Sequence, residues 1–550
     1  MSWGKLTSLA RSRCVLPVLA AGLVLSAVAR AQEAAPLTWE ALEARGAVIG
    51  DVVIDSGNVF DPKQPGEDHW LARLANALHM TTRPEVLRRE LGFAPGDPVS
   101  ARRIHEAERR LRGFRFIKDA RIRAELMDDG RVRAVVEAKD AWTLKASIGF
   151  SRVGGQNSFG FSLQEVNLLG RGKTIGLQYS QDPDRTSTLL RYQDPQLFGT
   201  AWTLRAVYQN LSDGQARELA LAKPFRGLDD AWAADGLVRD LSYQPFVEQQ
   251  GQMAYRVPLA EKTWEAGFAG AVWRSGAEVQ RLRIGAEYHQ IRYGALETVT
   301  PGLLPPPLLD DRRLAGPSIA WTYFQDGFIA TRDRLGMNQT EDYNLGWDLQ
   351  LGLGIYAEAF GSDRNSPFIR GRLAKGWAMD DSLVLLRVGG SARHEGEGIR
   401  EGVAGANLTW YGPVGKRFAS AARVDLDAVS GAGPEGVLYL GGEEGFRGYP
   451  NHFWAGDRRW LASFEERLFT DVQLWGLFRL GWVAFTDVGA IRRLDTGAWS
   501  RTYVDVGGGL RIGDLKSSLG RVVLLNLAWP LVREPSQDRW QLIFGNLVRF

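Results

Sequence analysis

The residues whose types could do chemistry gather near the C-terminal end of the chain. Arg447 stands between an aromatic residue and a glycine in Phe446-Arg447-Gly448-Tyr449, within a glycine-rich stretch, and the acidic residues Glu465 and Asp487 follow. A guanidinium presents its N–H donors in a planar fork that matches a carboxylate through two hydrogen bonds. These residue types therefore predict an ion pair that fixes a loop, and not a bond-making reaction.

Sets of residues typical of catalysis or of a cofactor site are not found. Gly172-Lys173-Thr174 matches the end of a phosphate-binding loop, but Asn167 stands where its first glycine is required, so a hairpin turn is the better interpretation. The chain has no G-x-S-x-G motif, and residues 141–550 contain only three histidines, none near a cysteine or at a metal-binding spacing. We expect a protein that is not an enzyme and uses no cofactor. A barrel phospholipase or protease is an alternative for which we find no residues.

The first 31 residues predict a secretory signal peptide. Basic residues precede an apolar run over 15–28, and Ala29-Arg30-Ala31 forms a small-x-small cleavage site. An anchoring helix is disfavoured because the run is shorter than the ~20 residues that a membrane span needs. Cleavage would remove Cys14, the only cysteine, and four positive charges, so the net charge falls from +3 to −1. A nearly neutral chain has no basic surface for nucleic acid.

The secondary-structure elements around Arg447, Glu465 and Asp487 must position these side chains. From Trp142 onward the sequence predicts that these elements are strands. Apolar and polar residues alternate with period two, as in 174–180, where Ile175, Leu177 and Tyr179 share one face. Glycine is 63 of 550 residues and aromatics reach 10%, and aromatics recur at strand ends as in the girdles of membrane barrels. We mark sixteen to nineteen segments and predict a mainly β fold with a transmembrane antiparallel β-barrel of about 16 strands over 141–550.

The same alternation assigns faces to the pairing residues. On 460–469, Glu465 and Arg467 fall on the lumen face, and on 483–489, Phe485 and Asp487 do. We predict that a loop around 440–456 folds into the lumen and that Arg447 pairs with Asp487 first and Glu465 second. The loop-lock residues are Phe446, Arg447, Gly448, Tyr449, Asp487, Glu465 and Phe485. The lock is either a rigid brace or a latch that rearranges while a client passes.

A small α+β module precedes the barrel. Residues 32–45 are interpreted as a linker, and 46–140 have the order β-α-α-β-β, with Thr82 as an expected helix cap and Asp128-Asp129-Gly130 as a hairpin turn. This order, with Gly96-Asp97-Pro98 between the helices, resembles a polypeptide-transport-associated (POTRA) domain. A small domain that merely plugs or spaces the barrel is the alternative.

Four motifs in order carry a resemblance for the barrel: Phe446-Arg447-Gly448-Tyr449, Glu465-x-Arg467, Phe485-Thr486-Asp487-Val488-Gly489 and Gly507-Gly508-Gly509-Leu510-Arg511. Together with the single POTRA-like module they resemble the bacterial surface antigen superfamily of BamA/TamA-like proteins. Phe446 departs from that superfamily's aliphatic residue. The last strand ends on an aromatic residue, which resembles the signal for outer-membrane insertion; its seam and signal residues are Trp540, Leu542, Phe544, Val548 and Phe550.

The resemblance implies a location in the bacterial outer membrane with the module in the periplasm. It implies a protein that inserts or translocates unfolded or secreted client polypeptides, in contact with outer-membrane lipids and with accessory envelope proteins. Clients would add a strand to the module's sheet edge, for which the expected residues are Ile117, Ala120, Ile122 and Ala124. The alternative function is a passive porin for small solutes.

Overall fold

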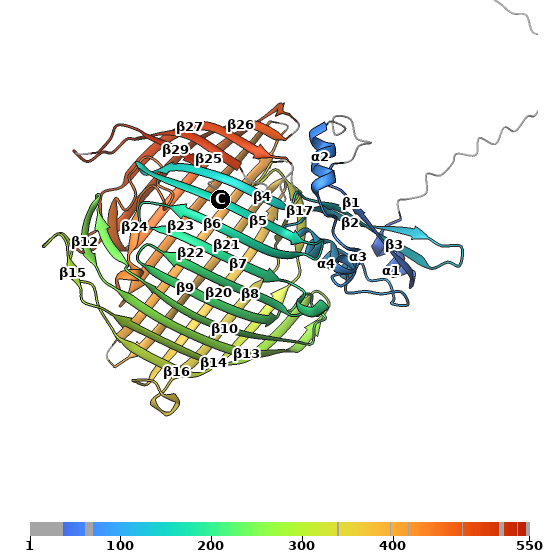
Figure 1. Ribbon diagram of the computed structural model, residues 1–550, viewed down its shortest axis with the longest axis horizontal. Coiled ribbons are helices and arrows are strands. Elements are labelled where there is room, and N and C mark those ends of the chain that lie inside the picture. Colours follow the sequence, from blue (N-terminus) through green and yellow to red (C-terminus); the bar gives the residue numbers. More distant parts are fainter. Residues whose placement is uncertain are drawn as a thin grey trace, which may run out of the picture.

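The computed structural model describes residues 37–60, 70–337, 340–396, 398–415, 417–475, 477–515, 522–535 and 537–545. The predicted signal peptide, Val548 and Phe550 therefore lie outside the described residues. Figure 1 shows two units, a large closed barrel and a small α+β module at one of its ends. We name this the module end of the barrel and the opposite one the far end.

The module is a three-stranded sheet covered by helices. Its sheet has the order β1-β3-β2, with β1 parallel to β3 and β2 antiparallel to it. Its elements are α1 (Trp39–Ala44), β1 (Ile49–Gly57), α2 (Trp70–Leu78), α3 (Pro84–Arg88), α4 (Ala101–Arg112), β2 (Ile117–Leu126) and β3 (Val132–Asp140). Ile104, Ala107 and Leu111 form one apolar stripe of α4 and are buried against the sheet. Trp39 and Leu42, in the stretch predicted as a linker, belong to the same core.

Thr82 does not cap a helix as predicted. The N-cap of α3 is Arg83, without a side-chain cap, and Thr82 is buried, donating through its hydroxyl to Asp140 Oδ1 at 2.8 Å. Its oxygen also accepts a 2.9 Å bond from Asn167 of the barrel. Tertiary contact between module and barrel therefore overrides the local capping preference.

The barrel consists of 20 antiparallel strands within the described residues, closed by pairing of its last strand with its first. The strands are β4 (Leu144–Val153), β5 (Gln156–Leu168), β6 (Lys173–Gln181), β7 (Thr186–Asp194), β8 (Thr203–Leu211), β9 (Gly214–Lys223), β10 (Trp232–Tyr243), β13 (Leu259–Ser275), β14 (Glu278–Tyr293), β16 (Arg312–Gln325), β19 (Asp348–Tyr356), β20 (Ser366–Met379), β21 (Ser382–Glu395), β22 (Gly398–Val414), β23 (Phe418–Ser430), β25 (Trp454–Leu474), β26 (Phe478–Arg493), β27 (Tyr503–Asp514), β28 (Val522–Pro530) and β29 (Gln541–Gly545).

The prediction of about 16 strands is wrong. Two-residue turns such as Gly154-Gly155 and Ser212-Asp213 leave few loop residues to separate neighbouring strands. Strands rich in glycine and alanine, such as β22, also show little contrast between their two faces. Segments that are two strands in the barrel therefore merge or go unmarked when boundaries are read from alternation alone.

Outward-facing side chains make the barrel's exterior apolar. On β5, Phe159, Phe161 and Leu163 alternate on the outside and are between 39% and 44% exposed. Soluble monomers rarely leave such rows uncovered over many strands. A side chain of this type on every second position is what contact with lipid tails requires.

Short elements extend from both ends of the barrel. At the far end, β11 (Phe246–Gln249), β12 (Gln252–Arg256) and β15 (Glu297–Thr298) form a small sheet, and β24 (Leu438–Leu440) pairs with the start of β25. At the module end, β17 (Phe328–Arg332) and β18 (Thr340–Asn344) form a hairpin between β16 and β19. Single turns of 3-10 helix occur at Leu197–Gly199, Glu358–Phe360 and Pro434–Gly436.

Candidate functional site

The loop 441–453 comes from the far end, and its apolar side chains are buried against the barrel wall. Phe446 and Tyr449 are fully buried and their rings stack at 4.3 Å. They pack in one cluster with Phe453, Tyr503 and other apolar residues of β25 to β27. The Tyr449 hydroxyl donates to the carbonyl of Val532 at 2.7 Å. This packing fixes the loop backbone, so that the side chain between the two aromatics has a defined position.

That side chain is Arg447, and it binds two carboxylates on neighbouring strands. Its Nε donates to Asp487 Oδ2 and its Nη2 to Asp487 Oδ1, each at 2.8 Å, while Nη1 donates to Glu465 Oε1 at 2.5 Å. The guanidinium also lies over the Phe485 ring, 3.6 Å from its centroid. Arg447 is 8% exposed. Charged hydrogen bonds shielded from water are strong and directional, so this fork holds the loop in one orientation.

Gly448 allows the loop to approach the wall. Its N–H donates to Asp505 Oδ2 at 2.7 Å, and an added Cβ would lie only 2.5 Å from the Asp505 Cβ. Asp505 is directly opposite Asp487 in the β26–β27 ladder. A side chain at position 448 would therefore push the loop away from the two carboxylates that it covers.

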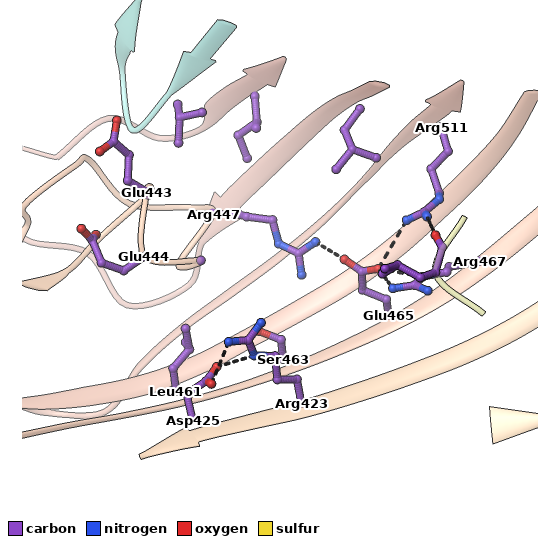
Figure 2. Close-up of a pocket in the computed structure, with 16 residues that line it drawn as sticks. Arg423, Asp425, Glu443, Glu444, Arg447, Leu461, Ser463, Glu465, Arg467 and Arg511 are labelled. Atoms are coloured by element: carbon purple, nitrogen blue, oxygen red, sulfur yellow. Dashed lines mark hydrogen bonds and ion pairs between the residues drawn. The ribbon is translucent and has the colours of Figure 1, made fainter. Parts of the chain in front are cut away.

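The ion pairs continue beyond Glu465 toward the module end. Arg467 Nε and Nη2 bind Glu465 Oε2 at 2.9 and 2.8 Å, and Arg511 Nη1 lies 3.6 Å from the same oxygen. Figure 2 shows Glu465 between Arg447 on one side and Arg467 and Arg511 on the other. These residues border a lumen cavity of about 320 Å³. Glu465 is therefore shared by the loop and the wall.

The segment between β16 and β19 reaches the same cluster from the module end. We name residues 326–337 and 340–347 the inserted segment. Arg467 Nη1 donates to the carbonyl of Arg334 at 2.6 Å and Arg511 Nη2 to that of Leu335 at 3.3 Å. Met337 is 1% exposed and packs on lumen-wall side chains from β23, β25 and β28. The far-end loop and the inserted segment thus meet on one wall, β23 to β28, through a shared ionic cluster.

The module holds the other end of the inserted segment. Arg109 of α4 donates to Asp326 Oδ2 at 2.7 Å, and Arg112 of α4 binds both oxygens of Asp342 at 3.0 and 2.8 Å. The Arg109 guanidinium also lies 4.3 Å from the centroid of the Phe328 ring. A continuous set of polar contacts therefore runs from α4 through the inserted segment to Arg447.

The residues predicted to receive a client lie on the edge strand of the module, but they do not present free side chains. Ile117, Ala120 and Ile122 are buried in the module core, and Ala124 packs against it. The outer backbone groups of β2 are also occupied. Glu108 accepts from the Ile122 N–H at 2.7 Å, Trp39 donates to its carbonyl at 2.9 Å, and Arg112 donates to that of Ala120 at 3.1 Å. The edge is thus capped by side chains over 120–122.

The predicted seam residues are described only in part. Trp540 is 52% exposed, and Leu542 and Phe544 are half-buried. In the part of the chain that the structure describes, β29 pairs with β4 through Phe544 and Arg152 alone. The closure of the barrel rests there on few backbone hydrogen bonds.

Sequence reasoning did not identify Asp505, Arg511 or the inserted segment as parts of the site. Asp505 could be found once the β26–β27 register is known, because it faces Asp487. Arg511 stands in one of the four motifs but had no assigned role. The inserted segment gives no such signal, since Arg467 and Arg511 bind it through backbone carbonyls that every residue possesses.

In the described ranges, no three His, Cys, Asp or Glu side chains lie where they could hold a metal ion. No helix in the same ranges is long and apolar enough to cross a membrane.

Comparisons with known proteins give structural similarities only. No protein-family model and no curated protein matches the chain. Among solved structures, CdiB from Escherichia coli is 13% identical, with a TM-score of 0.49 over 91% of this chain and 76% of that one. BamA from Haemophilus ducreyi lacking POTRA domains 1-3 is 13% identical (TM-score 0.39, 91% and 84%), and CdiB from Acinetobacter baumannii 11% (0.40, 91% and 73%). At these values the similarities do not assign the chain to a family.

Proposed function

We propose that the chain is an outer-membrane barrel of the bacterial surface antigen superfamily that inserts or translocates client polypeptides, with its module in the periplasm. The observation that carries this proposal is the Phe446-Arg447-Gly448-Tyr449 loop, held inside the barrel on Asp487 and Glu465. The order of the four motifs along the chain and the small α+β module in front of the barrel, with its three-stranded sheet β1-β3-β2, support it. The apolar exterior supports the membrane location.

The module captures the client by strand addition at β2. Ile122 and Ala120 present backbone groups toward the open edge, and these groups are bound by Glu108, Trp39 and Arg112. An incoming strand offers backbone N–H and C=O groups that can replace these side chains one for one. Capture is therefore an exchange of hydrogen bonds, and the caps keep the edge from pairing with unwanted strands.

Capture is coupled to the barrel through Arg112. The same guanidinium binds the β2 backbone at Ala120 and the carboxylate of Asp342 in the inserted segment. A client strand that takes over Ala120 frees Arg112 to move, and this weakens the hold of α4 on the inserted segment. The far end of that segment contacts Arg467 and Arg511, which bind Glu465 beside the Arg447 loop.

The passive porin accounts for fewer of these contacts. A porin has no need of a module bound to the barrel by paired arginines or of an edge strand with capped backbone groups. No residue described here favours a small-solute site over a polypeptide path, and we retain the porin only as an outcome of the test.

In vivo photo-crosslinking tests the proposal. Probes replace Arg121 and Arg123, whose side chains are exposed on β2, and a matched probe replaces Arg131 in the exposed hairpin turn. We expect discrete adducts with polypeptides at 121 and 123 and none at 131, with the clients identified by mass. Absence of adducts at both β2 positions, together with steady single-channel conductance in planar bilayers, would replace the proposal with the porin.

A further inference from the structure

A cavity of about 420 Å³ lies where the module meets the outside of the barrel. The module contributes α3 and the residues that flank it, and the barrel contributes the turns β5–β6 and β7–β8. Four cationic side chains line it: Arg83, Arg89, Arg171 and Lys173. Glu85 is the one acidic residue among its lining residues. The cavity therefore carries an excess of positive charge.

Three of these cations have no carboxylate partner in the described part of the chain. Arg83 donates through Nε to the carbonyl of Leu169 at 3.0 Å, and Arg89 contacts the neutral Gln196 at 3.4 Å. Arg171 is exposed, and among the described residues no side chain forms a hydrogen bond or ion pair with it. Lys173 alone is paired, with Asp194 at 2.9 Å. Elsewhere in the protein arginines commonly bind Asp or Glu, as Arg447 does, so unpaired guanidiniums around one cavity point to an anion from outside.

Two exposed apolar residues belong to this region: Phe198 lines the cavity, and the carbonyl of Leu169 accepts the bond from Arg83, which also lines it. Phe198 is 92% exposed and Leu169 is 53% exposed. Both adopt left-handed backbone conformations, with φ of 53° and 58°. A bulky residue in that conformation is strained by roughly 1 kcal/mol or more. Phe198 leaves nearly all of its side chain uncovered and Leu169 about half, so we infer that both are presented to an apolar environment outside the protein.

The position of the cavity on the outer face of the barrel indicates that this apolar environment is the membrane. Lys173 shares the outward face of β6 with Ile175 and Leu177, which are 44% and 46% exposed. On nearby strands at the same end, Trp232 stacks on Phe268 at 5.8 Å and Lys223 lies over the Trp232 ring. Aromatic and cationic side chains together mark the level of lipid headgroups. The inference thus rests on the proposed membrane location.

We propose that this cavity binds the phosphate-bearing headgroup of an anionic phospholipid from the membrane leaflet that faces the module. Arg83 and Arg89 bind the phosphate from the module, and Arg171 and Lys173 bind it from the barrel. Phe198 and Leu169 insert beside the acyl chains. Because cations from both units share one ligand, the bound lipid holds the module against the barrel.

Native mass spectrometry of the full protein in detergent, titrated with phosphatidylglycerol or phosphatidylethanolamine, measures the interaction. The test variant is Arg83→Gln/Arg89→Gln/Arg171→Gln. The control, Arg45→Gln/Arg131→Gln/Arg417→Gln, makes the same charge change at exposed sites away from the cavity. Each arginine near an anionic headgroup contributes roughly fivefold in affinity. We therefore expect one tightly bound phosphatidylglycerol per chain, about 100-fold weaker binding in the test variant and no change in the control.

Two further binding measurements distinguish a lipid ligand from a soluble phosphate ligand. Phe198→Ser should weaken phosphatidylglycerol binding and leave binding of glycerol 3-phosphate unchanged. If glycerol 3-phosphate binds as tightly as the lipid and Phe198→Ser changes neither, the ligand is a soluble phosphate and the lipid assignment is wrong. Equal affinity for the two lipids, or a test variant that binds like the wild type, would also overturn it. If the triple variant does not fold, the single variant Arg171→Gln, on an exposed turn, replaces it. It should bind phosphatidylglycerol roughly fivefold more weakly than the wild type, and unchanged binding would overturn the proposal. The photo-crosslinking of clients at β2 is a separate measurement, so the client-capture proposal and the lipid-binding proposal can each fail without the other.

Discussion

Replacing Arg447 with alanine removes both hydrogen bonds that its guanidinium donates to Asp487. Asp487 is fully buried, and Asp505 lies opposite it in the ladder. Glu465 keeps its two bonds from Arg467. The variant therefore leaves one buried carboxylate without its partner, beside a second one.

The expected cost follows from that arrangement. Removing one member of a buried ion pair destabilises a protein by about 3–5 kcal/mol, because the remaining charge keeps its desolvation penalty. Removing both members costs much less, so Arg447→Met/Asp487→Leu should be more stable than Arg447→Met alone. Arg423→Ala is the matched control, since its pair with Asp425 also faces the lumen but its side chain is 33% exposed. We expect about 1 kcal/mol or less for it.

Urea unfolding in detergent micelles, followed by tryptophan fluorescence, gives these free energies. Hydrogen exchange of 441–453 reports separately whether the loop has left the wall. The reasoning is refuted if Arg447→Ala costs no more than Arg423→Ala, or if the effects at 447 and 487 are additive.

Gly448→Ala should cost about 1–3 kcal/mol by overpacking and should speed exchange of the loop amides, which is checked in the same two assays. Arg112→Ala should loosen the inserted segment, seen as faster hydrogen exchange over 326–337 and 340–347, while Arg131→Ala, which removes an exposed pair, should leave it unchanged. His452 binds Glu248 at 2.7 Å outside the barrel strands. Burial is the largest single effect and opposes its charge, but the bond to Glu248 and the negative charges of Glu248, Glu444 and Asp184 together outweigh burial and raise the pKa of His452. Its stabilising effect is therefore complete below the ordinary histidine pKa of about 6.5 and is lost as pH rises through the raised value. The stability difference between wild type and His452→Gln should shrink from pH 5 to pH 9, and a difference that grows with pH would contradict this.

Much of the wall around the loop was predictable because strands alternate strictly. Once 460–469 is recognised as a strand, Glu465 and Arg467 must share a face, and this face is the lumen because Phe464 needs an apolar environment. The same logic puts Asp487 on the lumen face of β26. The strand number was not predictable in this way, because alternation has no marker for the short turns that divide one strand from the next.

The inserted segment and the capped edge could not be read from the sequence. Both depend on side chains that bind backbone groups far away in the chain, such as Trp39 with Ile122 and Arg467 with Arg334. Backbone groups are the same in every residue, so such contacts leave no pattern. Thr82 illustrates the reverse case, in which a clear local signal is overridden by a buried carboxylate from β3.

The most direct test of client capture compares photo-crosslinking yields at position 121 between the wild type and Glu108→Ala. Glu108 occupies the Ile122 N–H that an added strand would bind, and a hydrogen bond to a charged group contributes about 1.5–3 kcal/mol. Removing it should raise the yield of client adducts by about tenfold or until the signal saturates. Glu40→Ala removes an exposed carboxylate from α1 and should leave the yield unchanged. A yield that is the same in all three proteins would contradict strand addition at β2.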